Sequence, residues 1–240
     1  MTSFVLVHGA WHGSWCYSRV AKILRAAGHE VFTPTLTGLG ERSHLMRPEI
    51  DLDTHITDVL NVFKWEDLSN VVLCGHSYGG FVVTGVADAI ADKIAAIVYL
   101  DAYVPCDGDS VMSLLSKERQ AQILRDTQQH DNVAVAPPAP ERYGVNRHDI
   151  EWVRSKLTPH PLRTFQQPIR LTGNHHKPKR TYVHAIGQND SAPLYERYRC
   201  DPLWTVRVMD HVGHDQMVDD PATVAEILIS TAHEHAQSRP

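Results

Sequence analysis

The pentapeptide Gly-His-Ser-Tyr-Gly at residues 75–79 constrains the fold of this chain more than any other stretch of it. An apolar run at 71–74 precedes the pentapeptide, and a second apolar run begins at Phe81. A strand, a sharp turn and a helix are the context in which the serine of a Gly-x-Ser-x-Gly motif becomes a nucleophile. Ser77 would then occupy a strained turn, where the glycines remove Cβ atoms that would collide. The pattern predicts acyl-transfer chemistry at Ser77.

The helix that follows Ser77 strengthens this interpretation. Its N-terminus carries unpaired backbone N–H groups and the positive end of the helix dipole, both of which stabilise negative charge on a substrate oxygen. The competing interpretation is a glycine-rich turn whose serine only caps the helix. The flanking strand and helix patterns favour the nucleophile.

Length and charge indicate one compact domain with small-molecule partners. The chain has 240 residues, and 28 acidic against 23 basic residues give a net charge of −5. This balance excludes the basic surface that nucleic acids or anionic membranes require. No apolar stretch reaches the roughly 18 to 20 residues of a membrane span, and the first residues lack a signal-peptide pattern. We expect a cytoplasmic protein, either a monomer or a homodimer.

Cysteines and histidines give no sign of a metal or a disulfide. The four cysteines form no Cys-x-x-Cys pair, so we expect reduced thiols; they are Cys16, Cys74, Cys106 and Cys200. Three close histidine pairs lack a further ligand at a recognised metal-site spacing; they are His175 with His176, His211 with His214, and His233 with His235. The sequence predicts neither a metal nor a cofactor.

Short β-branched runs alternate with helical periodicity along most of the chain, which is typical of a parallel sheet covered by helices on both faces. The expected strands are 4–7, 30–33, 71–74, 95–100, 181–186 and 205–209. The expected helices are 15–27, 53–63, 81–91 and 221–235. The fold class is therefore α/β, with a mostly parallel sheet flanked by helices.

The alternation is interrupted between the strands that end near 101 and begin near 181. Proline-rich breaks at 137–140 and 159–161 separate helix fragments there. The segment carries too much apolar material for a disordered one. We interpret 105–177 as a helical cap or lid over a core formed by 1–104 and 178–240; an edge subdomain with its own small core is the alternative.

Three motifs carry a resemblance to a known family. They are Val-His-Gly-Ala-Trp-His-Gly at 7–13, the pentapeptide at 75–79, and Val-Gly-His-Asp at 212–215. With them the chain resembles the α/β-hydrolase superfamily over its whole length, and most closely the small esterases related to plant hydroxynitrile lyases and methylesterases, with their bacterial relatives. The resemblance implies the α/β-hydrolase fold and a cofactor-free serine hydrolase.

The resemblance also indicates the catalytic base. Ser77 needs a base to accept its proton, and His214 lies where the family has its catalytic histidine. His211, three residues earlier, is the rival. His76 directly precedes the nucleophile on the turn and is expected to point elsewhere.

The oxyanion hole is expected to use two backbone N–H groups. One belongs to Tyr78, next after the nucleophile, and the other to Ala10 in the loop after the first strand. The residues expected to line the substrate pocket are aromatic or apolar; they are Trp11, Tyr78, Met112, Tyr143, Trp152 and Phe165.

Two carboxylates compete for the third position of the triad. In the plant relatives the acid follows the strand that ends here near Ile186, where Asp190 is the only carboxylate. Asp101 ends the preceding strand, where 98–102 resembles the arrangement in haloalkane dehalogenases. We favour Asp101, because a strand-end carboxylate is held more rigidly than one in a loop. A helix-capping or loop-pinning aspartate is the alternative for Asp101.

Three functions remain open from the sequence. The favoured one is hydrolysis of a carboxylic ester, a carbamate or an activated amide that carries an apolar or aromatic group. The second is cyanohydrin cleavage, but the lyases have a hydroxyl side chain where Ala10 stands and a lysine where Asp215 stands. The third is a non-catalytic ligand-binding protein. Dehalogenase chemistry is disfavoured because it needs a carboxylate in place of Ser77.

Overall fold

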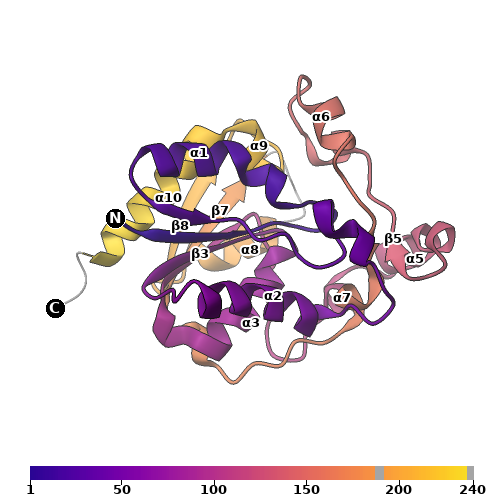
Figure 1. The fold of residues 1–240 in the computed structure, drawn as a ribbon, viewed down its shortest axis with the longest axis horizontal. Coiled ribbons are helices and arrows are strands. Elements are labelled where there is room, and N and C mark those ends of the chain that lie inside the picture. Colours follow the sequence, from indigo (N-terminus) through magenta and orange to yellow (C-terminus); the bar gives the residue numbers. More distant parts are fainter. Residues whose placement is uncertain (187–191, 237–240) are drawn as a thin grey trace.

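Six parallel strands form the central sheet of the computed structural model, which describes residues 1–186 and 192–236 (Figure 1). The strand order is β2-β1-β3-β4-β7-β8. The strands are β1 (Ser3–Val7), β2 (Glu30–Phe32), β3 (Val71–His76), β4 (Ile94–Leu100), β7 (Lys179–Ala185) and β8 (Trp204–Met209). Every residue of the two central strands β3 and β4 is buried, as expected for a parallel sheet covered on both faces. The predicted α/β fold class is confirmed.

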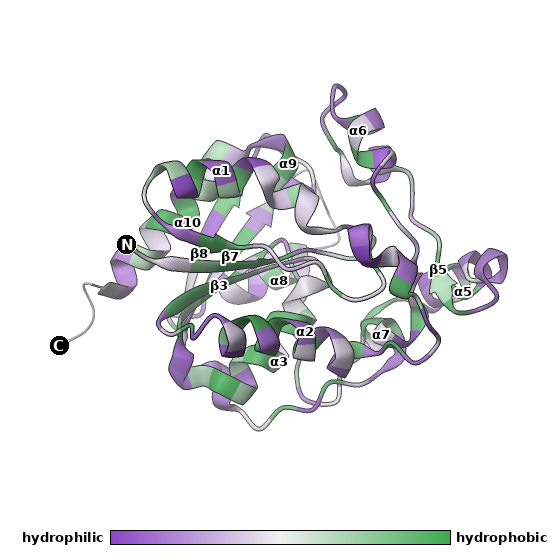
Figure 2. Ribbon diagram, viewed as in Figure 1, coloured by the Kyte–Doolittle hydropathy of each residue, from purple (hydrophilic) through white to green (hydrophobic). Residues whose placement is uncertain are grey.

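Helices cover both faces of this sheet (Figure 1). The helices α1 (Ser18–Ala26) and α10 (Pro221–Ala236) pack against each other on one face, and α2 (Leu52–Trp65) and α3 (Gly79–Ile90) pack on the other. Each pair closes its own hydrophobic cluster against the strands. Figure 2 shows hydrophobic residues concentrated in the strands and in the inward faces of these helices.

Helix boundaries follow local capping chemistry. Asp51 caps α2, because its Oδ1 accepts hydrogen bonds from the backbone N–H and the hydroxyl of Thr54 at 3.0 and 2.8 Å. The helix expected at 15–27 consists of a 3₁₀ turn, η1 (Ser14–Tyr17), followed by α1. The remaining short 3₁₀ turns within the described residues are η2 (Gly40–Leu45), η3 (Ala91–Lys93), η4 (Gln128–His130), η5 (Pro140–Tyr143) and η6 (Asn174–His176).

The segment between β4 and β7 extends beyond the carboxyl ends of the strands, on the right of Figure 1. It contains short elements: α4 (Val111–Leu114), α5 (Lys117–Asp126), α6 (Ile150–Arg154), α7 (Leu162–Gln166), and the antiparallel pair β5 (Ala134–Val135) and β6 (His160–Pro161). After β7 the described chain resumes with α8 (Ala192–Tyr198), and α9 (Gln216–Asp219) precedes α10. The loops after β1, β3, β4 and β8 all open toward this inserted segment.

Candidate active site

Ser77 lies on the turn between β3 and α3, in a conformation that L-residues rarely adopt. Its φ angle is 52°, in the left-handed region. The turn is tight: a Cβ on Gly75 would lie 2.7 Å from the Gly79 carbonyl oxygen, and one on Gly79 would lie 2.8 Å from the His8 carbonyl oxygen. The glycines of the motif are therefore required for the chain to reverse, and Ser77 is presented at the N-terminus of α3.

Asp101 and His214 form a short hydrogen bond beside this turn. The Nδ1 of His214 lies 2.6 Å from Oδ2 of Asp101, whose side chain is buried. The backbone N–H of Asp101 donates to the Val183 carbonyl at 2.8 Å, and the N–H of Ala185 donates to Asp101 Oδ1 at 3.3 Å. Because the carboxylate accepts, the proton of the neutral imidazole sits on Nδ1, so Nε2 is the acceptor nitrogen of the ring.

The backbone of His214 is held from two sides. Its N–H donates to the Tyr143 carbonyl at 2.8 Å, and His76 Nε2 donates to its carbonyl at 3.0 Å. The rings of Tyr143 and His76 lie 5.1 and 4.6 Å from the imidazole, measured between ring centroids. The inserted segment and the nucleophile turn therefore both position this histidine.

The two other histidines considered as bases are placed differently. His211 is exposed and lies between the carboxylates of Asp220 and Asp210, which raise the pKa of its imidazole. His76 is buried, and burial lowers its pKa to about 3, so it is a neutral donor. Asp190, the alternative acid, lies outside the described residues.

The two expected oxyanion donors lie next to this turn. Among the described residues no acceptor takes up the backbone N–H of Ala10 or that of Tyr78. The peptide that carries the Ala10 N–H is fixed by His8, whose Nδ1 donates to the Gly9 carbonyl at 2.8 Å. The backbone N–H of Leu36 donates to His8 Nε2 at 3.1 Å, and burial lowers the pKa of His8 to about 3. The loop after β1 is thus held by a neutral histidine with both ring nitrogens occupied.

A cavity of about 440 Å³ opens over Ser77, between the sheet and the inserted segment. Its volume is that of a small-molecule site. Ala10, Ser77, Asp101 and His214 are among its lining residues. The rest of the lining is largely apolar and includes Trp11, Val111, Leu114, Ile123, Tyr143 and Phe165.

Four of the expected pocket residues line this cavity; they are Trp11, Tyr78, Tyr143 and Phe165. The hydroxyl of Tyr78 points away from substrate into the core, where it donates to His55 Nδ1 at 2.9 Å. His55 Nε2 in turn donates to the Thr37 carbonyl at 2.9 Å. Burial raises the pKa of Tyr78 far above its usual range, so this hydroxyl stays protonated.

Trp152 and Met112 do not line this cavity, contrary to expectation. Trp152 packs edge-on against Trp15 at 5.2 Å between ring centroids, and the Arg19 guanidinium lies 4.8 Å above its ring. The short helix α6 therefore directs Trp152 toward α1. Met112 packs partly buried against the hydrophobic cluster on the α2 and α3 face.

Two cationic residues at the cavity were not predicted. Arg119 on α5 is half-buried and Arg142 on η5 is exposed, and both line the cavity. No motif marks either residue, and their segments are too short for periodicity to predict which way a side chain points.

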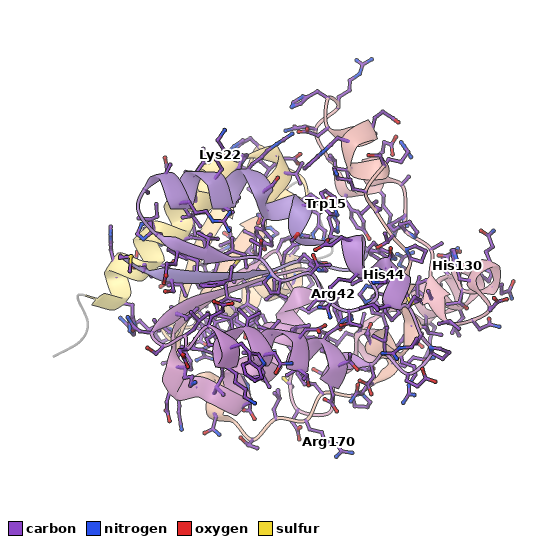
Figure 3. All side chains as sticks on the ribbon, in the orientation of Figure 1. Trp15, Lys22, Arg42, His44, His130 and Arg170 are labelled. Carbon is purple, nitrogen blue, oxygen red and sulfur yellow. The ribbon has the colours of Figure 1, made fainter. Side chains whose placement is uncertain are left out.

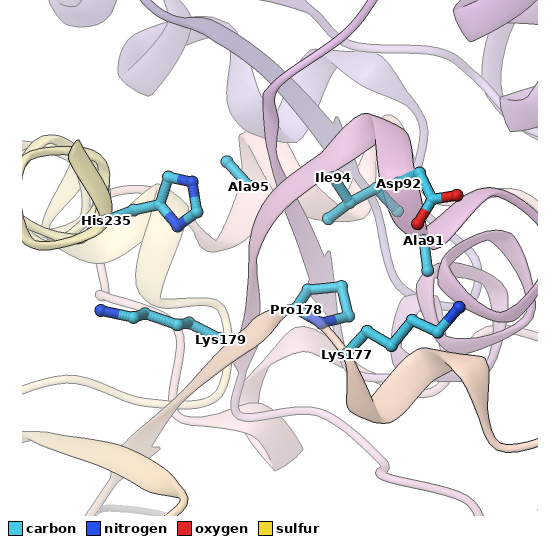
Figure 4. A pocket seen from close by; sticks show the side chains of 8 residues that line it. All are labelled: Ala91, Asp92, Ile94, Ala95, Lys177, Pro178, Lys179 and His235. Carbon is cyan, nitrogen blue, oxygen red and sulfur yellow. The ribbon is translucent and has the colours of Figure 1, made fainter. Parts of the chain in front are cut away.

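A second hollow, of about 270 Å³, lies at the opposite edge of the sheet (Figure 4). It is lined by the first residues of β4 and β7 and by His235 of α10. This end of a parallel sheet carries none of the loops that hold Ser77, Asp101 and His214.

The described residues contain neither a cluster of metal-binding side chains nor a membrane-spanning helix. No three histidine, cysteine, aspartate or glutamate side chains among them form a group that could hold a metal ion. No helix in the same part of the chain has the length and apolar character needed to cross a membrane.

Comparison with known proteins agrees with the fold. A model of the alpha/beta hydrolase family matches residues 4–227. The chain belongs to the alpha/beta hydrolase family. This hydrolase is 45% identical to a carbendazim hydrolyzing esterase from Nocardioides sp. (strain SG-4G), over 95% of this chain and 98% of the relative. It is 24% identical to the rice esterase PIR7B, over 97% and 96% of the two chains.

Solved structures have the same fold. An extracellular alpha/beta-hydrolase from a Paenibacillus species superimposes with a TM-score of 0.81 at 22% identity, covering 96% of this chain and 99% of the other. The methylesterase MES16 from Arabidopsis superimposes with a TM-score of 0.79 at 24% identity, covering 98% and 100%. At these identities the match establishes the fold of this hydrolase.

Proposed function

We propose that this hydrolase cleaves small carboxylic esters through an acyl-enzyme intermediate on Ser77. The observation that carries the proposal is the 2.6 Å hydrogen bond between Asp101 and His214 beside a serine held at a φ of 52°. A nucleophile, a base whose Nε2 is an acceptor, and an acid that fixes the tautomer are the three parts that acyl transfer requires. The esterase names of its relatives support the same reaction class.

The reaction follows from these roles. Ser77 Oγ attacks the ester carbonyl carbon while His214 Nε2 takes its proton, and the N–H groups of Ala10 and Tyr78 stabilise the oxyanion. The C–O bond to the alcohol then breaks, and the imidazolium of His214 protonates the leaving oxygen. Water, deprotonated by His214, attacks the acyl-enzyme, releases the acid and restores Ser77.

A panel of substrates tests this proposal. We expect turnover of p-nitrophenyl esters, with kcat/KM depending on acyl length because the cavity is closed by apolar walls. Aryl carbamates, carbendazim and mandelonitrile complete the panel. Cyanide release from mandelonitrile should stay at background, because Ala10 offers no hydroxyl and Asp215 stands where the lyases have lysine. Robust cyanide release without ester turnover would refute the proposal.

The cavity also predicts a preference for acidic substrates. Asp101 is the one carboxylate among the lining residues of the described chain, and it is bonded to His214. No carboxylate in this part of the chain pairs with the Arg119 guanidinium. A half-buried cation without a counter-ion favours a ligand that brings one.

A comparison of an anionic ester with a neutral one tests whether Arg119 contributes to this preference. For Arg119→Gln we expect KM for the p-nitrophenyl monoester of glutaric acid to rise about fivefold, the effect of roughly 1 kcal/mol. KM for neutral p-nitrophenyl hexanoate should not change, and Arg119→Lys should retain most of the preference. Arg170→Gln removes the same charge at an exposed site away from the cavity and is the control (Figure 3). An equal effect of Arg119→Gln on both esters would contradict the prediction.

A further inference from the structure

A buried pair of charged side chains lies behind the candidate site. His12 Nε2 is 3.1 Å from Asp215 Oδ2, and the two side chains are only 3% and 1% exposed. His12 Nδ1 lies 2.7 Å from the Ala10 carbonyl oxygen. A carbonyl and a carboxylate oxygen can only accept hydrogen bonds, so both contacts are hydrogen bonds only when both ring nitrogens of His12 carry a proton. The geometry therefore fits an imidazolium paired with a carboxylate and enclosed in the protein.

The pair connects two loops that the reaction needs in register. The β1 loop, residues 8–13, carries the Ala10 N–H, and the histidine loop, residues 210–215, carries His214. Asp215 directly follows His214, and His12 binds the carbonyl of Ala10 itself. In the described structure the contact between His12 Nε2 and Asp215 Oδ2 joins the two loops side chain to side chain.

Packing keeps water away from the pair. The indole of Trp15 stacks on the His12 ring at 5.1 Å between centroids and an interplanar angle of 25°. His76 lies edge-on to the same ring at 5.9 Å, and its Nε2 is 3.8 Å from Asp215 Oδ1. Trp15 is labelled in Figure 3 at the entrance to α1. A charge pair with so little water has a strong field and a fixed geometry.

We propose that His12 and Asp215 are positioning residues for ester hydrolysis: their buried ion pair holds the oxyanion loop and the histidine loop in register and places a negative charge beside His214. The proposal rests on the function proposed above. Neither residue lines the cavity, so neither touches substrate. The pair acts through Ala10 on the oxyanion side and through His214 on the base side.

The charges around the pair decide the sign of its effect. Burial alone would raise the pKa of Asp215, but His12 beside it holds that pKa well below its usual value. Asp215 is therefore an anion, and it directly follows His214, with which it interacts electrostatically. A nearby anion favours the imidazolium form of His214.

Other titratable groups near the pair and His214 do not supply a competing charge change. Burial raises the pKa of Cys16, Tyr17 and Tyr143, so they stay neutral. Burial lowers the pKa of His8 and His76 to about 3, so these stay neutral too. The other charged or titratable groups nearby include the carboxylates of Asp101 and Asp219, His184 at 3.7 Å from Asp101 Oδ1, and Arg119 and Arg142 at the cavity. All of them are unchanged in the variants below.

The first test is the pH dependence of Asp215→Asn. The acid limb of kcat/KM reports the pKa of the base in the free enzyme, which must be neutral to act. Loss of the anion lowers that pKa, so the limb should move to lower pH by about 0.5 to 1 unit. kcat at the optimum should fall about tenfold with KM nearly unchanged. Asp220→Asn, which removes a carboxylate that bonds exposed His211 instead, should do neither.

The second test is a double-mutant cycle. His12→Gln removes the charge on the other side of the pair, and its loss of kcat should not add to that of Asp215→Asn, because partners in one interaction are not additive. A purely structural role would lower kcat in proportion to Tm and leave the acid limb in place. An unmoved limb, or fully additive losses, would overturn the proposal.

The third test needs neither activity nor a variant that folds. Nitrogen-15 NMR of the histidine-labelled wild type should show both ring nitrogens of His12 protonated at pH 7.5. A His12 resonance with a single N–H would overturn the ion pair. If the wild type cleaves no ester in the panel, the proposed function fails, while this measurement still decides whether the pair exists.

Discussion

Replacement of Ser77 by alanine is expected to abolish ester hydrolysis and leave the fold intact. Without Oγ no acyl-enzyme forms, and loss of the nucleophile in a comparable triad costs about 10⁶ in kcat. Alanine and serine both carry a Cβ, so the strain at a φ of 52° is the same in the two proteins. The measurement is kcat with the best ester of the panel, together with Tm.

Covalent labelling makes the same prediction site-specific. A fluorophosphonate should add once to the wild type at Ser77 and should not add to Ser77→Ala, as read by mass spectrometry of the digested protein. Ser230→Ala is the matched control, because Ser230 bonds the Ile227 carbonyl within α10, away from the cavity. Labelling at another serine, or undiminished turnover by Ser77→Ala, would rule out the mechanism.

The exchange of Asp101 for asparagine has the second-largest expected effect. An asparagine amide can donate to His214 Nδ1, which would place the imidazole proton on Nε2 and remove the base. The comparable change in a serine protease costs about 10⁴ in kcat, and we expect a loss of that order here. KM should change little, because the shape of the cavity is retained. Asparagine keeps the oxygen that accepts from the Ala185 N–H, so Tm should fall only modestly.

Asp190 provides the contrast for this prediction. It is the acid expected from the plant relatives, and it lies outside the described residues. Asp190→Asn should leave kcat within about twofold of wild type. A large loss in Asp190→Asn with a small one in Asp101→Asn would assign the acid to the plant-like position.

The sequence predicted the parts of the site that depend on strand ends. In a parallel sheet, all the carboxyl ends lie at one edge, so residues that directly follow strands come together whatever lies between them. This is why the sequence alone predicts that Ser77 after β3 and Asp101 after β4 lie near each other. The turn that carries Ser77 is local, because its glycines and the apolar runs on either side of it are contiguous in the sequence.

The inserted segment could not be predicted in the same way. Its helices span four to ten residues, too short to establish which face of each is buried. In the structure Trp152 packs against Trp15, whereas Arg119 lines the cavity. Nothing in the sequence indicates which of these two side chains faces the cavity.

The sequence did not predict the bond between His12 and Asp215, for a different reason. The two residues are 203 positions apart, and each belongs to a motif that was interpreted through other residues, Ala10 in one case and His214 in the other. The sequence indicated for Asp215 only that it stands where the lyases have lysine. A histidine between two acceptors is visible only when the acceptors are located in space.

The hydrogen bond from the His214 N–H to the Tyr143 carbonyl connects the lining of the cavity to the proposed base. The same inserted segment that walls the cavity also anchors the main chain of the base. Replacing the inserted segment with that of another protein, to change selectivity, would therefore also disturb the position of His214. It would not do so if the replacement restored a carbonyl in the place of that of Tyr143. Gly213 further limits which replacement segments would fit, since any side chain at 213 would collide with the carbonyls of Tyr143 and Gly144. Selectivity and turnover in this hydrolase would have to evolve together.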